Sequence, residues 1–206
     1  DEYQDEGDDS LWFYFNTSTG AKTVSADNKR IGGLYYSFDE NGVMNHGWNV
    51  ASGSAASESR YFSGSDQGWK QRNTWVWAVP SADIDADDNA NDQYRWFYVD
   101  STGKPTVDKA RRINSKWYIF DQNGIMKSGL VVLNAAKISS NAQLDYGYGT
   151  EGKLDLENLE GEELKTWNIP DTEGIYYFGN DEENDGAMKT GTNIRIDMAD
   201  GTYTFG

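Results

Sequence analysis

The chain has 206 residues and a formal net charge of -16, from 34 acidic and 18 basic side chains. This excess of acid disfavours nucleic acid and anionic membrane surfaces as partners, because both are bound through clustered Lys and Arg. The absence of cysteine excludes disulfides and thiolate metal sites. No apolar run reaches 18 residues, so we expect no membrane insertion.

Aromatic residues are the second unusual feature of the composition. Only 37% of the residues are hydrophobic, yet 14% are aromatic, including 8 Trp and 13 Tyr. Disordered acidic chains carry few aromatics, so we expect a folded chain whose apolar surface comes largely from rings. The chain begins at Asp1, without Met or a signal peptide, and we interpret it as a piece of a longer secreted or surface protein.

Two aromatic motifs recur along the chain. The first, Trp-Phe-Tyr-Phe at residues 12–15, ends near Gly20 and returns at residues 96–99 and 175–178, which end near Gly103 and Gly186. The second, at residues 35–44, reads YYSFDENGVM and returns at residues 117–126 as WYIFDQNGIM. Residues 202–205 resemble the start of another second-type motif. Such internal repetition predicts a repeat architecture.

Each motif predicts a β-hairpin. Runs of aromatic residues favour strands, and the Asn-Gly pairs at 41–42 and 123–124 tolerate the positive φ of tight turns. A single hairpin is marginal in water, whereas stacked hairpins bury their shared faces. We therefore predict an all-β solenoid of stacked β-hairpin repeats with almost no helix. Residues 154–164 carry leucines among acids and fit a solvated loop or strand, or one turn of helix.

The motifs group into about two and a half larger repeats. We place these at residues 11–90, 94–172 and 173–206, the last one truncated, within a single solenoid over residues 1–206. The stretch from Arg60 to Pro80 corresponds in this interpretation to the stretch from Asp145 to Pro170.

Alternation along the strands assigns faces to the rings. Trp96 and Tyr98 share one face, which has polar atoms and could be wet, while Phe97 and Val99 share the other, which should be core. The same logic sets Trp12 and Tyr14 against Phe13 and Phe15, and it puts Trp75 and Trp77 on one side of a strand. Two interpretations of the Trp/Tyr faces stay open. The rings either stack as core between hairpins or form platforms for sugars and cations.

The second motif and its flanks resemble the cell-wall-binding repeat family. That family includes choline-binding repeats, the glucan-binding repeats of glucansucrases and the carboxy-terminal repeats of large clostridial toxins. The resemblance is strongest at residues 35–48 and 117–129. It implies a solenoid of hairpins in which exposed rings hold ligands between successive repeats, caging choline or stacking on sugars.

The resemblance also implies which rings would hold a ligand. They are the first ring of each run, the third ring where it is aromatic, and the Trp of a Gly-Trp element, namely Trp12, Tyr35, Trp96, Trp117, Tyr14, Tyr98, Tyr177 and Trp48. Several positions depart from the family pattern. The third position is Ser37 or Ile119 in the second-type motifs, and Leu130 replaces the Trp after Gly129. These departures break the choline cage and favour carbohydrate as the ligand.

Acidic runs and the single histidine offer alternatives to a binding module. The spacing of Asp83, Asp85 and Asp87 suggests calcium, but Asp88 stands where the loop needs Gly, which favours a solvated loop; residues 181–185 give the same result. A catalytic triad would have to use His46, which has no motif around it. We expect no cofactor and no metal.

The sequence therefore predicts a non-catalytic, extracellular module that binds a cell-wall or surface glycan and anchors a larger protein. A choline (teichoic-acid) module, a purely structural spacer and a hidden glycosidase or amidase are the alternatives. On this hypothesis Trp48→Ala weakens binding more than folding, whereas Gly42→Val and Gly124→Val damage the turns.

Overall fold

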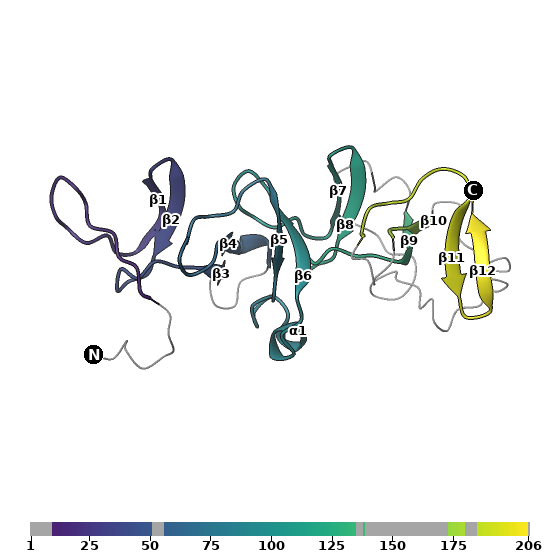
Figure 1. Cartoon of the computed structure of the whole chain (residues 1–206), viewed down its shortest axis with the longest axis horizontal. Helices are drawn as coiled ribbons and strands as arrows, with labels where there is room; N and C mark the ends of the chain where they lie inside the picture. The colour runs from purple at the N-terminus through teal and green to yellow at the C-terminus, as the bar shows by residue number, and fades with distance from the viewer. Residues whose placement is uncertain (1–9, 51–55, 135–137, 139–172, 180–184, 206) are drawn as a thin grey trace. The chain divides into compact units, whose positions relative to one another are not determined.

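The chain folds as a succession of antiparallel β-hairpins (Figure 1). The computed structural model describes residues 10–50, 56–134, 138, 173–179 and 185–205. The paired strands are β1 (Ala26–Ile31) with β2 (Leu34–Phe38), β3 (Gly47–Asn49) with β4 (Arg60–Phe62), β5 (Thr74–Ala78) with β6 (Arg95–Val99), β7 (Lys109–Ile113) with β8 (Lys116–Phe120), β9 (Leu130–Asn134) with β10 (Glu173–Tyr177), and β11 (Ile194–Met198) with β12 (Gly201–Phe205).

Helical elements in the described part are short. They are the 3-10 turn η1 (Ala56–Glu58) and the helix α1 (Ala86–Ala90). The prediction of an all-β solenoid built from stacked hairpins is confirmed. Residues 154–164 and 145–170 lie outside the described residues. No helix in the described ranges has the length and apolar character needed to cross a membrane.

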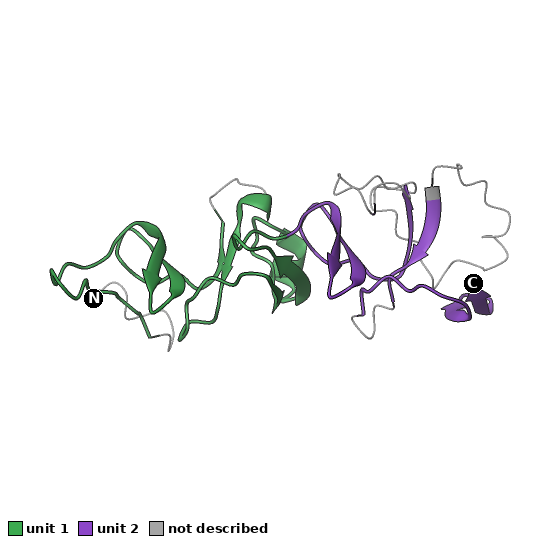
Figure 2. Ribbon diagram, turned by 90° about the horizontal axis from the view of Figure 1, so that it is seen from above, with its two compact units in different colours: residues 1–105 green, residues 106–206 purple. Residues whose placement is uncertain are grey.

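The hairpins form two compact units, Asp1–Pro105 and Thr106–Gly206 (Figure 2). The first contains β1 to β6 and the second β7 to β12. The grouping into larger repeats at 11–90, 94–172 and 173–206 stays a prediction.

The position of the tight turn differs from the sequence prediction. The aromatic run is the second strand of its hairpin, and the strand before it is joined by a two-residue turn at Gly32 and Gly33, or at Asn114 and Ser115. All four of these residues have positive φ. Two-residue turns with positive φ match the twist of the flanking strands, so they set the register. The Asn-Gly pairs instead lie after the aromatic run.

An aspartate organises three of the turns that follow the aromatic runs. At the first of them the Gly42 N–H donates to the Asp39 carbonyl (3.1 Å), and the Val43 N–H donates to Asp39 Oδ1 (2.8 Å). Gly42 and Gly124 both have φ of +77°, which confirms the expected need for glycine. Asp100 and Asp121 accept the equivalent bonds in later hairpins.

Successive hairpins are joined by a recurring main-chain hydrogen bond. At three of the turns, the residue that follows the turn donates its N–H to the carbonyl of the first ring position in the preceding hairpin. This bond runs from Met44 to Trp12 (2.8 Å), from Lys70 to Tyr35 (2.7 Å) and from Met188 to Trp117 (2.8 Å).

The core is built around one apolar residue at the end of each of five aromatic segments, the run at residues 12–15 excepted. Each of these side chains is at most 3% exposed, and they are Phe38, Phe62, Val99, Phe120 and Phe178. In the second unit β9 is buried on both faces. One face packs with Ala110 and Ile119, and the other with Ile196 and Met198. The continuous apolar run at residues 130–133 is the sequence counterpart of this two-sided burial.

The contact of each turn glycine with the preceding hairpin gives a stability test. A Cβ on Gly42 would lie 2.8 Å from the Thr23 carbonyl oxygen, whereas a Cβ on Gly33, also at positive φ, would meet nothing within 4 Å. Gly42→Ala should cost roughly 2–4 kcal/mol of unfolding free energy, from strain and overpacking. Gly33→Ala should cost about 1 kcal/mol. Chemical denaturation measures both, and equal losses would show that the stacking contact contributes nothing.

Candidate ligand-binding site

The β5–β6 hairpin separates a dry face from a face that reaches solvent. Val76, Ala78, Phe97 and Val99 point to one side and are at most 5% exposed. This confirms the prediction that Phe97 and Val99 form core. The opposite side carries Trp75 paired with Tyr98 and Trp77 paired with Trp96 across the ladder. We call these four rings, together with Tyr94, the aromatic face.

The rings of the aromatic face contact one another. Trp77 lies 4.9 Å from Trp96 at an interplanar angle of 38°, and 5.8 Å from Tyr94 at 30°. Trp75 meets Trp96 and Tyr98 edge to face, at 6.1 Å and 5.3 Å. Trp77 and Tyr94 are 42% and 52% exposed. The result is a cluster of mutually tilted rings that is open to solvent at Trp77 and Tyr94, with Trp75 roughly perpendicular to Trp96 and Tyr98.

Exposed rings of this kind can bind two classes of ligand. Ring faces attract the C–H groups of a sugar by dispersion, and they attract a cation through the ring quadrupole. Sequence analysis identified Trp96 and Tyr98 and left Trp75 and Trp77 as core or platform. It missed Tyr94, because this residue lies outside the four-residue aromatic run. The available signal was the alternation of Tyr94, Trp96 and Tyr98 along one strand.

The connection from β5 to β6 is fixed beside the aromatic face by its acidic residues. Asp85 caps α1 by accepting the Asp88 N–H at 3.0 Å, and Arg95 binds Asp88 with two hydrogen bonds of 2.7 Å. Asn89 Nδ2 donates to the Pro80 carbonyl (2.8 Å).

The acidic run at residues 83–92 is therefore not simply the solvated loop that the sequence favoured. It contains a short capped helix, because Asp85 satisfies an N–H at its start. In the described ranges no three acidic or histidine side chains gather into a set that could hold a metal ion. Residues 181–184 of the second acidic run lie outside these ranges, and His46 is exposed.

Trp48 occupies the interior side of the first unit. Its ring meets Phe97 edge to face at 4.7 Å and Tyr61 at 5.1 Å. Its Nε1 is buried and has no hydrogen-bond partner in the described part of the chain. Burial, with a smaller contribution from Tyr94, raises the pKa of the neighbouring Tyr61 hydroxyl. These contacts show that Trp48 packs against other rings of the first unit, and its role in ligand binding stays a prediction.

The first aromatic run is more exposed than predicted. Phe13 and Phe15, which the alternation assigned to core, are 43% and 55% exposed. The reason is that no described strand covers them, and Phe15 forms a single bridge with Lys22. Trp12 is 49% exposed, while Tyr14 is half-buried against Phe38 with a centroid distance of 6.4 Å.

The remaining predicted rings lie in three different settings. Tyr35 lines an open pocket in the first unit. Trp117 packs against the apolar cluster around Ile119 and Val131, and Tyr177 packs against the cluster around Leu130 and Ile196. The structure thus brings Trp96 and Tyr98 together on one face and distributes the other predicted site residues over separate hairpins.

The chain resembles proteins of known kind in sequence and in structure. It is 29% identical over 181 residues to Glucosyltransferase-S of Streptococcus mutans serotype c, and this match covers 87% of the chain and 10% of that protein. The chain thus spans about a tenth of the curated relative that it matches. No family model matches.

Two solved structures from Streptococcus pneumoniae are also similar. The modular autolysin LytC, in complex with a synthetic peptidoglycan ligand, is 22% identical with a TM-score of 0.45, over 92% of this chain and 30% of LytC. Choline binding protein F is 19% identical with a TM-score of 0.42, over 88% of this chain and 45% of that chain. The resemblance to cell-wall-binding repeat proteins is confirmed as a similarity of the repeats.

The different settings of two tryptophans give a test by matched substitution. Trp48→Ala should lower the free energy of unfolding by roughly 3 kcal/mol, since it empties a site against the buried Phe97. Trp77→Ala removes an exposed ring and should cost less than about 1 kcal/mol. Urea denaturation followed by circular dichroism compares the two. A smaller loss for Trp48→Ala than for Trp77→Ala would restore Trp48 as a ligand residue.

Proposed function

We propose that this chain is a non-catalytic module that holds a surface or cell-wall polysaccharide on the aromatic face of β5–β6. The observation that carries the proposal is the contacting cluster of Trp77, Trp96 and Tyr94, with Trp77 and Tyr94 exposed, on the side of the hairpin opposite the buried Val76, Phe97 and Val99. The similarity to a glucosyltransferase and to an autolysin bound to a peptidoglycan ligand supports a saccharide as the ligand class.

Binding at such a face is weak and gains strength by repetition. The exposed rings offer dispersion contacts to one or two sugar rings, but few polar groups that could hydrogen-bond to the sugar. A long polymer that meets several such faces binds more tightly, because the second contact forms at a high effective concentration. The exposed Trp12 is a candidate for a further contact of this kind.

Choline is the second candidate ligand. The acidic net charge favours a cation, and choline binding protein F is among the similar structures. A choline cage needs rings that surround one point. The rings of the aromatic face all lie on or beside the one β5–β6 hairpin, whereas the cage implied by the family resemblance takes rings from successive repeats, so we favour a sugar.

The setting of the module belongs to the same proposal. A wall-binding module would act outside the cell, on the bacterial surface or secreted, and would anchor or target a larger protein. The similar proteins are streptococcal and much longer than this chain, which agrees with that role. Catalysis would reside elsewhere in such a protein.

Isothermal titration with soluble α-glucan and, separately, with choline tests the proposal. The unmodified chain should bind glucan, and Trp77→Ala should weaken that binding about tenfold, or 1.4 kcal/mol. Phe15→Ala removes a ring outside the aromatic face that is more exposed than Trp77 (55% against 42%), and it should change the affinity less than twofold. Saturation by choline alone would establish the choline alternative, and silence with both ligands would favour a structural spacer.

A further inference from the structure

A basic pocket lies in the first unit of this acidic chain. It has a volume of about 330 Å³ and is lined by Tyr35, Asn28, three cations and the turn at residues 101–102. The cations are Arg60, Lys70 and Arg72. The pocket shares no residue with the aromatic face.

Arg72 and Lys70 are held in place by hydrogen bonds that use only some of their N–H donors. Arg72 Nε donates to the Ser101 carbonyl (2.5 Å), and Lys70 Nζ donates to Asn28 Oδ1. Both cations also lie over the Tyr35 ring, with Arg72 Cζ at 5.1 Å and Lys70 Nζ at 5.9 Å from its centroid. A guanidinium has five N–H donors and an ammonium three, so these bonds leave most of the donors available.

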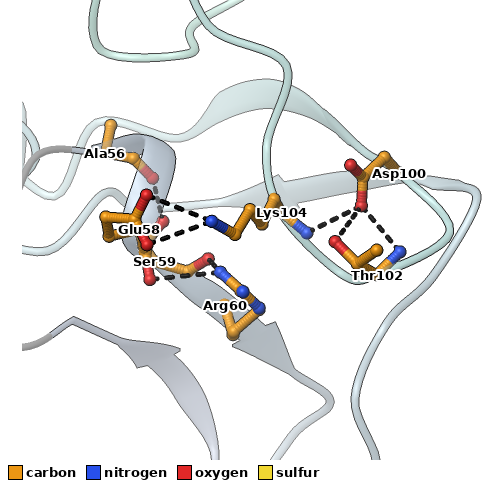
Figure 3. A network of polar contacts seen from close by, with 7 residues as sticks. All are labelled: Ala56, Glu58, Ser59, Arg60, Asp100, Thr102 and Lys104. Atoms are coloured by element: carbon orange, nitrogen blue, oxygen red, sulfur yellow. Dashed lines mark hydrogen bonds and ion pairs between the residues drawn. The ribbon is translucent and has the colours of Figure 1, made fainter.

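Of the acids close to the pocket in sequence, Asp100 and Glu58 are already engaged. Asp100 accepts from the Thr102 N–H and hydroxyl, both at 2.7 Å (Figure 3). Lys104 Nζ binds both oxygens of the Glu58 carboxylate, at 3.0 and 3.1 Å (Figure 3). Arg60 Nη1 instead donates to the main-chain carbonyls of Glu58 and Ser59, at 3.1 and 2.7 Å (Figure 3). Among the described residues, no carboxylate lies within ion-pair distance of Arg60, Lys70 or Arg72.

Gathering these cations is unfavourable without an anion. Burial, followed by the charges of Arg60 and Arg72, lowers the pKa of the Lys70 ammonium, and Asp27 opposes this only in part. Like charges held together in this way favour any group that brings negative charge among them. An anion in the pocket would meet Arg and Lys donors, which form strong charge-assisted hydrogen bonds with phosphate and carboxylate.

We propose that this pocket binds an anionic saccharide through its phosphate or carboxylate group. Its volume suits one sugar unit that carries one such group. The Thr102 hydroxyl donates to Asp100 Oδ1 (2.7 Å), so it can meet a sugar hydroxyl only as an acceptor. The pocket repels choline, because a quaternary ammonium would meet three positive charges. The site goes beyond the proposed glycan platform, since it selects charge where the aromatic face selects a flat apolar surface.

Nuclear magnetic resonance titration with four small probes tests the site. Glycerol 3-phosphate and glucuronate supply the phosphate and the carboxylate, and glucose and choline are the neutral and cationic controls. We expect saturable shifts of the Tyr35 and Arg72 signals with at least one anion, weakened by added salt, and none with glucose or choline. A response to one anion alone identifies the group that is bound. No response to either anion, or an equal response to glucose, would overturn the proposal.

Charge-matched variants complete the test. Arg72→Gln should weaken anion binding at least tenfold, whereas Arg112→Gln, which removes an exposed arginine outside the pocket, should change it less than twofold. Lys70→Gln is a second variant of the pocket. It should keep or raise the midpoint of unfolding, because it relieves the repulsion between Lys70 and the two arginines. Equal losses from Arg72→Gln and Arg112→Gln would show a general charge effect and sink the proposal. Trp77→Ala should leave anion binding intact, so failure of the glycan platform would be seen separately.

Discussion

The hydrogen bond between one hairpin and the carbonyl of the preceding aromatic strand is the constraint on which this fold depends. Isolated two-stranded hairpins are marginal in water, so each must be held against its neighbour. The bonds from Met44 to Trp12 and from Lys70 to Tyr35 provide that attachment without using any side chain. Because this attachment uses main-chain atoms, it does not require particular side chains at these positions, and they can differ from repeat to repeat.

Because the main chain joins the hairpins, side chains at equivalent positions of the aromatic pattern can have different environments. The last ring of each run is buried wherever it is covered, as at Phe38 and Phe120, because it faces the stack. The main chain of the first ring is held by this bond at Trp12, Tyr35 and Trp117, while the side chains of the first rings meet different partners. Tyr35 meets a pair of cations, Trp117 an aliphatic cluster, and Trp96 two tryptophans of its own hairpin.

The sequence was sufficient to predict the fold class and insufficient to predict the site. Repetition, aromatic runs and Asp-x-Asn-Gly turns specify hairpins, and the positive φ of Gly42 confirms the turn chemistry. The main pairing partner of β2 differs from the prediction, because Gly32 and Gly33 form the tighter turn, while the predicted pairing across residues 41–42 is a single bridge between Phe38 and Met44. Contacts between hairpins depend on residues far apart in the chain, so periodicity could not distinguish the interior setting of Trp48 from the open setting of Trp77.

Lys70 belongs to two systems at once. Its main-chain N–H joins the β3–β4 hairpin to β2, and its side chain lines the basic pocket. A ligand that binds the folded chain alone stabilises it by mass action. An anion held by this side chain would therefore resist separation of the two hairpins that the amide joins. In a module that tethers a protein to a polymer under load, occupancy of the pocket and mechanical strength of this junction would rise together.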